Sequence, residues 1–269
     1  MNVKNHDTRF EAMEISEIVE ENSYTKTYVF KYDLGAKPGQ FVMLWVPGVD
    51  EKPFSVAYCD SGEFWLTICA VGPCSKAIYE MKVGDRVGIR GPFGTEYDIG
   101  EGEHLALVSG GYGAAPMYFV AKEALKKGCK VEFLTGARSE DLLLFEERVA
   151  GLGDDVTWHC STDDGSKGFK GYVTQLLSEV MKDVKLDKIF ACGPEVMMKA
   201  AGEAAGDVPA YLSMEKYMKC GFGVCGQCAI DDTGDLCCKK GPVMAYDYVK
   251  GLSEFGKYHR DAQGKKNEY

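Results

Sequence analysis

The sequence has no long apolar run. Its first seven residues, 1–7, contain no apolar core and therefore predict no secretory signal peptide. The longest uncharged run, 105–121, is interrupted by a glycine-rich turn at 110–113 and by Pro116. These interruptions predict a strand, a loop and the start of a helix instead of a membrane span. We therefore expect a soluble, cytoplasmic protein with no membrane partner.

Basic residues are in the minority. The chain has 31 Lys and Arg against 41 Asp and Glu, a formal net charge of -10. This balance argues against binding to nucleic acid or anionic membranes, because both need a basic surface. Repeats at the periods of solenoid proteins are also absent. The 269 residues are 45% hydrophobic, which excludes a mostly disordered chain and suits two compact domains with a small third module.

Hydrophobic patterning divides the chain into zones. The first zone has short β-rich runs separated by turn residues, which predicts an antiparallel barrel or sandwich. Its runs are 25–30, 40–46, 54–58, 64–69 and 86–91. The second zone alternates strands with helices, which predicts a parallel, doubly wound sheet covered on both faces. Its strand candidates are 105–109, 130–135, 156–159 and 188–191, and its helical stretches are 115–127, 140–149, 173–181 and 195–205.

The third zone, 211–269, has almost no regular periodicity and ends in a polar tail. It has too little apolar sequence to form a core alone, so we expect a covalent or coordinate link to hold it. The expected fold class is multi-domain, β followed by α/β. We predict a β-barrel domain over 1–101, an α/β domain over 102–210 and a cysteine-rich module with its tail over 211–269.

Eleven cysteines are many for a cytoplasmic chain, and an odd number suits a disulfide framework poorly. Five of them lie in one window: Cys220, Cys225, Cys228, Cys237 and Cys238. The first three have C-x4-C-x2-C spacing, which together with a later cysteine is the plant-type [2Fe–2S] pattern. The glycines between them let the loop curl and turn backbone N–H groups toward sulfur. The window therefore predicts an iron–sulfur cluster.

Two questions stay open for this window. A structural zinc site is the alternative, although zinc usually takes two separate C-x2-C pairs and only Cys225 and Cys228 have that spacing. A cluster needs four ligands, so either Cys237 or Cys238 is spare. The spacing does not choose between them.

Candidate nucleotide-binding segments follow two strands of the second zone. The strand 105–109 leads into Gly110-Gly111-Tyr112-Gly113 and then a helix, an arrangement that forms a pocket for an anionic group. The string is not G-x-G-x-x-G, so an ordinary tight turn is the alternative. Cys192-Gly193-Pro194 follows the strand 188–191 and therefore lies at the carboxyl end of the sheet, where open α/β folds bind ligands.

Two segments of the first zone carry groups that suit a flavin. Lys52-Pro53-Phe54-Ser55 combines a cation, an aromatic ring and a hydroxyl, which could hold a phosphate, stack on a ring and hydrogen-bond to it. Gly72-Pro73-Cys74-Ser75 precedes an expected helix over 76–81, whose N-terminus could accept a phosphate and which Ser75 could cap. An ordinary barrel strand and turn is the alternative.

Taken in order, these segments resemble the ferredoxin–NADP reductase superfamily and, more narrowly, the electron-transfer subunits of type B dihydroorotate dehydrogenase. The resemblance covers about 14–258 and is most specific over 215–228, E-K-Y-M-K-C-G-F-G-V-C-G-Q-C, and over 238–243, C-K-K-G-P-V. It implies the metal ligands Cys220, Cys225, Cys228 and Cys238, with Cys237 as the spare cysteine.

The resemblance also implies the other site residues. The family's flavin motif R-P-[FIL]-S corresponds to Lys52, Pro53, Phe54 and Ser55. Lysine stands in place of the motif's arginine, so a point charge replaces a guanidinium that can form two parallel hydrogen bonds to a phosphate. A second flavin segment corresponds to Thr67, Ile68, Cys69, Gly72, Cys74 and Ser75. The nicotinamide half-site corresponds to Gly110, Gly111, Gly113, Cys192, Gly193 and Pro194, and Cys192 is the catalytic candidate beside nicotinamide and flavin.

The function implied is that of an oxidoreductase subunit in pyrimidine biosynthesis. NADH would reduce FAD, and single electrons would pass through the [2Fe–2S] cluster to the FMN of a separate dihydroorotate dehydrogenase subunit. Nothing in the chain resembles an orotate site, so we expect that partner, in a heterotetramer. The alternatives with the same cofactors are the small subunit of an NADH-dependent ferredoxin–NADP oxidoreductase, a sulfide dehydrogenase or a hydrogenase diaphorase. A zinc-stapled interaction module without enzyme activity is a third hypothesis.

Other polar residues are expected to have structural roles. Arg138 follows a strand where a cation could hold the 2′-phosphate of NADP, but the acidic pair 140–141 opposes this and favours a surface arginine. His104 and His159 adjoin strands and are expected to be hydrogen-bonded structural residues. Some members of the ferredoxin–NADP reductase superfamily end in an aromatic residue that shields the flavin. In this sequence a cysteine module and a polar tail precede the terminal Tyr269, so we do not assign that role to it.

Overall fold

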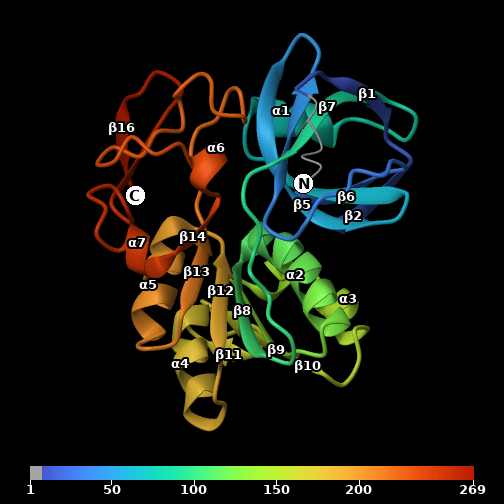
Figure 1. Cartoon of the computed structure of the whole chain (residues 1–269). Coiled ribbons are helices and arrows are strands. Elements are labelled where there is room, and N and C mark those ends of the chain that lie inside the picture. The colour runs from blue at the N-terminus through green and yellow to red at the C-terminus, as the bar shows by residue number, and fades with distance from the viewer. Residues whose placement is uncertain (1–7) are drawn as a thin grey trace.

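The computed structural model describes residues 8–269, and the segment 1–7, for which no signal peptide is expected, lies outside them. The first zone forms an antiparallel half-barrel of seven strands in the order β1-β7-β4-β5-β6-β3-β2 (Figure 1). Its strands are β1 (Glu11–Glu14), β2 (Glu17–Asn22), β3 (Thr25–Phe30), β4 (Phe41–Val46), β5 (Asp50–Asp60), β6 (Glu63–Cys69) and β7 (Arg86–Phe93). The predicted antiparallel fold of this zone is confirmed.

Alternation of apolar side chains builds the inside of the half-barrel. In β6, Phe64, Leu66 and Ile68 are buried while the residues between them face outward. Phe30 of β3 stacks on Phe64, with ring centroids 5.0 Å apart. The patterning predicted β3 to β7 but not β1 and β2, because these two edge strands are short, rich in Glu and contain a single buried residue, Met13.

The second zone forms another seven-stranded sheet, ordered β11-β10-β9-β8-β12-β13-β14, in which only β13 and β14 pair antiparallel. Its strands are β8 (His104–Gly110), β9 (Lys130–Ala137), β10 (Val156–Thr162), β11 (Phe169–Lys170), β12 (Lys188–Cys192), β13 (Ala210–Ser213) and β14 (Val243–Ala245). α2 (Ala114–Lys126) covers one face, and α4 (Val173–Asp183) and α5 (Glu195–Ala204) cover the other (Figure 1). Both faces are buried, as predicted.

The helix predicted over 140–149 is wrong as a continuous element. The segment is a single 3-10 turn, η2 (Glu140–Leu142), followed by a short helix, α3 (Glu146–Ala150). Between them Phe145 takes a φ of 67° and is buried against Tyr118, with ring centroids 5.4 Å apart. Burial of this aromatic ring outweighs the helical propensity of its neighbours.

The chain beyond residue 210 continues the second sheet across the predicted domain limit. β13 pairs with β12, and β14 pairs with β13. The remaining elements are short: α6 (Cys237–Lys240), α7 (Tyr246–Val249), β15 (Tyr258–Arg260) and β16 (Lys266–Glu268). Met214, Met218 and Leu252 share one buried cluster with α4, α5 and Met43 of the half-barrel. Apolar packing therefore helps to hold this zone, which its lack of periodicity did not predict.

Within residues 8–269, no helix has the length and apolar character needed to cross a membrane.

Candidate functional site

The cysteine loop lies against the half-barrel. Gly221 has a φ of +78°, and a Cβ at this position would lie 2.7 Å from Cγ of Met43, so both the backbone and the packing require glycine. Arg90 of β7 donates a hydrogen bond of 3.2 Å to the carbonyl oxygen of Lys219. Its guanidinium also lies 5.2 Å from the ring centroid of Phe222. Strands β4 and β7 therefore position the start of the loop.

Backbone N–H groups point at the sulfur atoms of the loop. The amides of Val224 and Cys225 donate to Sγ of Cys220 at 3.4 and 3.5 Å, and the amide of Gln227 donates to Sγ of Cys225 at 3.5 Å. Burial raises the pKa of the Cys220 thiol, but the N–H donors outweigh it and lower this pKa to about 7. These donors thus favour the thiolate of Cys220, the form that binds metal.

Cys237 and Cys238 are neighbours in sequence but differ in surroundings. The amide of Cys238 donates to Sγ of Cys228 at 3.4 Å. A hydrogen bond with the Cys238 side chain, helped by backbone N–H groups, lowers the pKa of Cys228 to about 6 despite burial. Sγ of Cys237 instead points to the carbonyl oxygen of Met214 at 3.8 Å, and burial raises the pKa of Cys237 to about 12. The contact with Cys228 and burial raise the pKa of Cys238 as well, so the pKa values do not separate the two cysteines. Their contacts do, because Cys238 contacts another candidate ligand, whereas Cys237 faces the core.

The donor set fits an iron–sulfur cluster chemically. Over residues 8–269, no three His, Cys, Asp or Glu side chains are grouped to hold a single metal ion. A [2Fe–2S] cluster divides four thiolates between two irons, so its ligands surround a larger group. Cys220, Cys225, Cys228 and Cys238 lie on one segment, and backbone amides are aimed at the first three sulfurs.

The two predicted nicotinamide segments meet at the carboxyl ends of β8 and β12, which are adjacent parallel strands. A Cβ on Gly113 would lie 2.1 Å from the carbonyl oxygen of Cys192, and one on Gly193 would lie 2.9 Å from the amide nitrogen of Gly110. The close approach of two backbones explains Gly113 and Gly193, whereas Gly111 has open space and a φ of +54°. The residues brought together here are Gly110, Gly111, Gly113, Cys192, Gly193 and Pro194.

Tyr112 lies in the glycine turn, which is beside β6 of the half-barrel, and its side chain is half-exposed. Its pKa is raised, first by the nearby Glu215 carboxylate, then by partial burial and by the thiols of Cys192 and Cys69. Cys69 ends β6 of the half-barrel, and Cys192 ends β12 of the second sheet. Sequence reasoning assigned no site role to Tyr112 or Glu215. Their positions were the available signals, since Tyr112 lies inside the glycine turn and Glu215 opens the most specific stretch.

Cys192 is a thiol and not a nucleophilic thiolate. Burial raises its pKa to about 12, although a hydrogen bond with Ser213 opposes this shift. At roughly pH 8 only about one such thiol in ten thousand is ionised, so iodoacetamide should leave Cys192 unmodified in the folded protein. Peptide mass spectrometry measures this, with the urea-unfolded chain as the control in which Cys192 is alkylated. Full alkylation of Cys192 in the folded chain would contradict its assignment as a half-buried, protonated thiol.

Lys52 connects the predicted flavin strand to the cysteine segment. Its ammonium is 2.7 Å from a carboxylate oxygen of Asp50 and donates to the hydroxyl of Tyr217 at 2.8 Å. The same ammonium lies 4.4 Å from the centroid of the Tyr217 ring. Pro53, Phe54 and Ser55 follow Lys52 along β5 and pair with β4. The charge predicted to hold a flavin phosphate is thus already neutralised in part by a protein carboxylate.

The predicted residues of β6 point in two directions. Thr67 and Cys69 face outward, and the Thr67 hydroxyl is 2.8 Å from that of Thr27. Ile68 faces the interior of the half-barrel and is 1% exposed. Ile68 could therefore contribute only its backbone to a bound flavin.

The helix after β6 starts earlier than predicted. α1 (Pro73–Tyr79) has Gly72 as its N-cap, so the prediction of a start at residue 76 with Ser75 as the cap is wrong. Pro73 at the first helical position pre-sets the helical φ and explains the start. The Ser75 hydroxyl accepts the Gly72 amide at 3.0 Å, and the buried Cys74 thiol points to the carbonyl oxygen of Asp50 at 3.8 Å.

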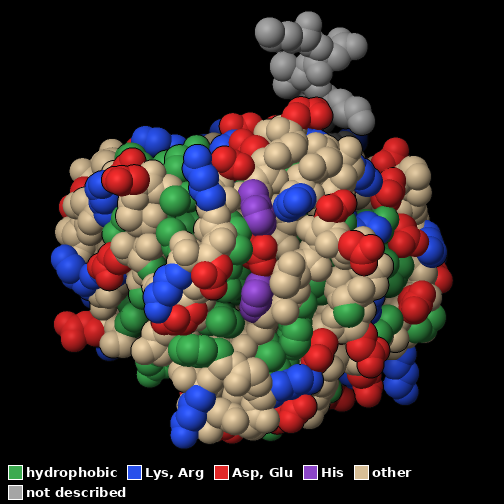
Figure 2. Space-filling model, turned by 90° about the horizontal axis from the view of Figure 1, so that it is seen from below, with side chains coloured by type: hydrophobic (Ala, Val, Ile, Leu, Met, Phe, Trp, Pro, Cys, Tyr) green, Lys and Arg blue, Asp and Glu red, His purple; other side chains and the backbone are tan. Residues whose placement is uncertain are grey.

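The polar residues expected to be structural have protein partners or are exposed. Glu132 bridges two histidines, with Oε1 2.9 Å from Nε2 of His104 and Oε2 2.7 Å from Nε2 of His159. Figure 2 shows histidine and acidic side chains side by side on the lower face of the molecule. Both histidines are thus hydrogen-bonded, as predicted, and Arg138 is exposed.

Comparison with known proteins identifies the family. The chain matches the oxidoreductase NAD-binding domain over residues 107–203 and the iron–sulfur cluster binding domain of dihydroorotate dehydrogenase B over residues 215–250. It is 46% identical over 257 residues to a probable dihydroorotate dehydrogenase B (NAD(+)) electron transfer subunit of Methanocaldococcus jannaschii, which covers 95% of this chain and 97% of the relative. The chain belongs to the family of dihydroorotate dehydrogenase B electron transfer subunits.

Further comparisons agree with this family. A relative with the same description from Methanothermobacter thermautotrophicus is 41% identical over 262 residues, which is 95% of this chain and 96% of the relative. Among solved structures, the chain is similar to that of an NADH-dependent reduced ferredoxin–NADP oxidoreductase studied for flavin-based electron bifurcation. The TM-score is 0.80, with 28% identity over 87% of this chain and 88% of the other. The family resemblance seen in the sequence is therefore confirmed.

Proposed function

We propose that this chain passes electrons between NADH and the catalytic subunit of a dihydroorotate dehydrogenase in pyrimidine biosynthesis. The observation that carries the proposal is the meeting of three parts around Tyr112. The glycine turn that holds Tyr112 lies beside β6 of the half-barrel, which ends at Cys69, and Gly113 of this turn approaches the backbone of Cys192 in the second sheet. The carboxylate of Glu215, in the segment that leads into the cysteine loop, is near enough to raise the pKa of Tyr112. A nicotinamide, a flavin and a cluster would therefore be held close to one another.

Each part has residues suited to one cofactor. FAD, when bound, accepts a hydride and releases its electrons singly, and a [2Fe–2S] cluster carries one electron at a time. Gly110 to Gly113 and Cys192 to Pro194 would hold the nicotinamide end of NADH. Lys52 to Ser55, Thr67 to Cys69, and Gly72, Cys74 and Ser75 would hold FAD. Cys220, Cys225, Cys228 and Cys238 would ligate the cluster.

The protein part of the mechanism is positioning. The close backbone approach of Gly113 to Cys192 keeps the nicotinamide segments in one arrangement. The protonated thiol of Cys192 adds a polar lining without adding a charge. Lys52 and Tyr217 join the predicted flavin strand directly to the cysteine segment, and this contact would hold the two cofactor-binding segments together.

The proposal includes an FMN-containing catalytic partner in a heterotetramer. The tip of the cysteine loop is accessible to such a partner, because Val224 is 76% exposed and Cys225 is also exposed. All eleven cysteines are free of disulfides, which suits a reducing compartment and supports a cytoplasmic location.

Co-expression with a candidate dihydroorotate dehydrogenase catalytic subunit tests this proposal. The purified pair should reduce orotate with NADH, whereas either subunit alone should not. Two variants localise the contact with the partner. Val224→Asp changes the tip of the cysteine loop, and Val83→Asp, in an exposed turn of the half-barrel domain, is its control. NADH should still bleach the flavin of both variants, and orotate reduction should fall only in Val224→Asp. Failure of the two chains to copurify or to exchange electrons would refute the dihydroorotate assignment.

The similarity to the ferredoxin–NADP oxidoreductase supports a second candidate function with the same cofactors. The same preparation, assayed with reduced ferredoxin and NADP in place of the catalytic subunit, separates the two. Turnover in that assay without orotate reduction would favour the second candidate.

A further inference from the structure

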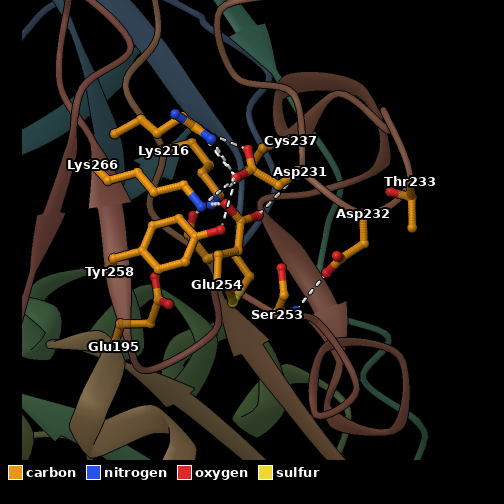
Figure 3. A network of polar contacts seen from close by, with 12 residues as sticks. Glu195, Lys216, Asp231, Asp232, Thr233, Cys237, Ser253, Glu254, Tyr258 and Lys266 are labelled. Carbon is orange, nitrogen blue, oxygen red and sulfur yellow. Dashed lines mark hydrogen bonds and ion pairs between the residues drawn. The ribbon is translucent and has the colours of Figure 1, made fainter.

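The last residues of the chain fold back onto the cysteine segment. β15 and β16 form an antiparallel hairpin in which Tyr258 pairs with Glu268 and Arg260 with Lys266. This hairpin lies outside the family match over 215–250. Figure 3 shows its side chains converging with Asp231 and Glu254 into one polar network.

Asp231 is the main contact of the hairpin. It lies in the loop between Cys228 and Cys238, two of the four candidate ligands. Arg260 donates to both of its carboxylate oxygens, with Nε at 2.8 Å from Oδ1 and a terminal nitrogen at 2.7 Å from Oδ2. The hydroxyl of Tyr258 donates to Oδ2 at 2.8 Å. Such paired, charge-assisted hydrogen bonds are strong and fix geometry.

A buried ion pair continues the network to the other side of the cysteine segment. Lys216 lies four residues before Cys220, and its ammonium is 2.7 Å from Oε2 of Glu254. The two side chains are 7% and 2% exposed. Oε1 of Glu254 accepts a hydrogen bond of 3.4 Å from the amide of Asp231. Both ends of the cysteine segment are thereby tied to the residues that lead into the hairpin.

A third contact reaches the nicotinamide segment. Glu195 directly follows Pro194 and is 5% exposed. It accepts a hydrogen bond from the amide of Gly256 at 2.7 Å and another from the hydroxyl of Tyr269 at 3.0 Å. The carboxyl-terminal segment thus spans from the second sheet to the cysteine loop.

We propose that this hairpin is a clamp that holds the cysteine segment closed around its cluster, with Asp231 and Arg260 as the positioning residues. Opening of the loop between Cys228 and Cys238 would spread two ligands apart and release iron. The hairpin contacts must break before the loop opens, so they slow this release. Within residues 8–269, the flavin segments make no hydrogen bond or ion pair with Asp231 or Arg260, and they approach the network only through Lys52 and Tyr217, the neighbour of Lys216. Flavin retention should therefore not depend on the contact between Asp231 and Arg260.

Iron release to a chelator tests the clamp in the full-length, cluster-loaded chain without any partner. Asp231→Asn and Arg260→Met should each accelerate the loss of cluster absorbance by about tenfold or more, because each removes charge-assisted hydrogen bonds. The double variant should be no faster than the single variants, since both break the same contact. Arg260→Lys should restore part of the protection. Asp247→Asn is the matched control, because among residues 8–269 the carboxylate of Asp247 forms its ion pair with Lys250 alone, on an exposed helix turn.

Two further measurements separate a clamp from general loosening. Amide hydrogen exchange in cluster-free protein should rise over residues 229–236 in Asp231→Asn and stay unchanged in β8 and β12. FAD should be retained equally by all variants. Unchanged iron release in Asp231→Asn would overturn the proposal, and so would equal acceleration of iron and FAD loss. Neither result would affect the orotate assay, which tests the function separately.

Discussion

Cys238→Ser should lose the cluster. The Cys238 side chain hydrogen-bonds to Cys228, and its amide donates to the same sulfur at 3.4 Å, and for this reason we propose Cys238 as the fourth ligand. A serine hydroxyl is a much poorer iron ligand than a thiolate, and we expect iron affinity to fall by roughly a hundredfold or more. Iron content and the visible absorbance and EPR signal of the anaerobically purified chain measure the loss.

Cys237→Ser is the matched control for this prediction. Cys237 is fully buried, and its thiol points to the carbonyl oxygen of Met214. A hydroxyl there keeps a hydrogen-bond donor, so the variant should lose only about 1 kcal/mol of unfolding free energy and retain its iron. If Cys237→Ser lost the cluster and Cys238→Ser kept it, the ligand assignment would be reversed. Zinc in place of iron in the unsubstituted chain would instead favour the zinc-site hypothesis.

Gly113→Ala should abolish rapid reduction of the flavin by NADH. The added Cβ would meet the carbonyl oxygen of Cys192 at 2.1 Å and its carbonyl carbon at 2.6 Å. Both obstacles are backbone atoms, so the ends of β8 and β12 must move apart. A misplacement of about 1 Å costs roughly a hundredfold in rate, and we expect a loss of at least that size. Stopped-flow bleaching of the flavin by NADH under anaerobic conditions measures the rate.

The control for Gly113→Ala is Gly251→Ala, because a Cβ on Gly251 meets nothing within 4 Å. Reduction of the flavin by dithionite should proceed in both variants, which shows that each is folded and holds FAD. A Gly113→Ala protein with an unchanged NADH rate would mean that this close approach does not position the nicotinamide.

Side-chain periodicity was enough to predict most of the two sheets. Runs of alternating or continuous apolar residues predict β3 to β7 and β8, β9, β10 and β12, because burial of one or both sheet faces is a local property of each strand. The edge strands β1 and β2 were not predictable in this way, since their Glu-rich residues bury little. The interruption of the predicted helix at Phe145 was not predictable from periodicity either, because it depends on contact with Tyr118 on a different helix.

The candidate site also has features that the sequence predicted and features that only the structure shows. Spacing alone indicated the cysteine loop and the glycine turn, because a short segment that wraps a cluster or a phosphate must carry its ligands and glycines locally. Spacing did not separate Cys237 from Cys238. Their difference arises from the core that Cys237 enters beside Met214.

The sequence by itself determined the order of the half-barrel, the doubly wound sheet and the cysteine loop, together with the family. Only the tertiary structure decided what contacts what across long separations: Lys52 with Tyr217, Lys216 with Glu254, and Asp231 with Arg260. Periodicity and spacing record how a segment buries or binds within itself. Charged and polar pairs distant in sequence leave no such pattern, because each residue alone looks like ordinary surface polarity until folding brings its partner into reach.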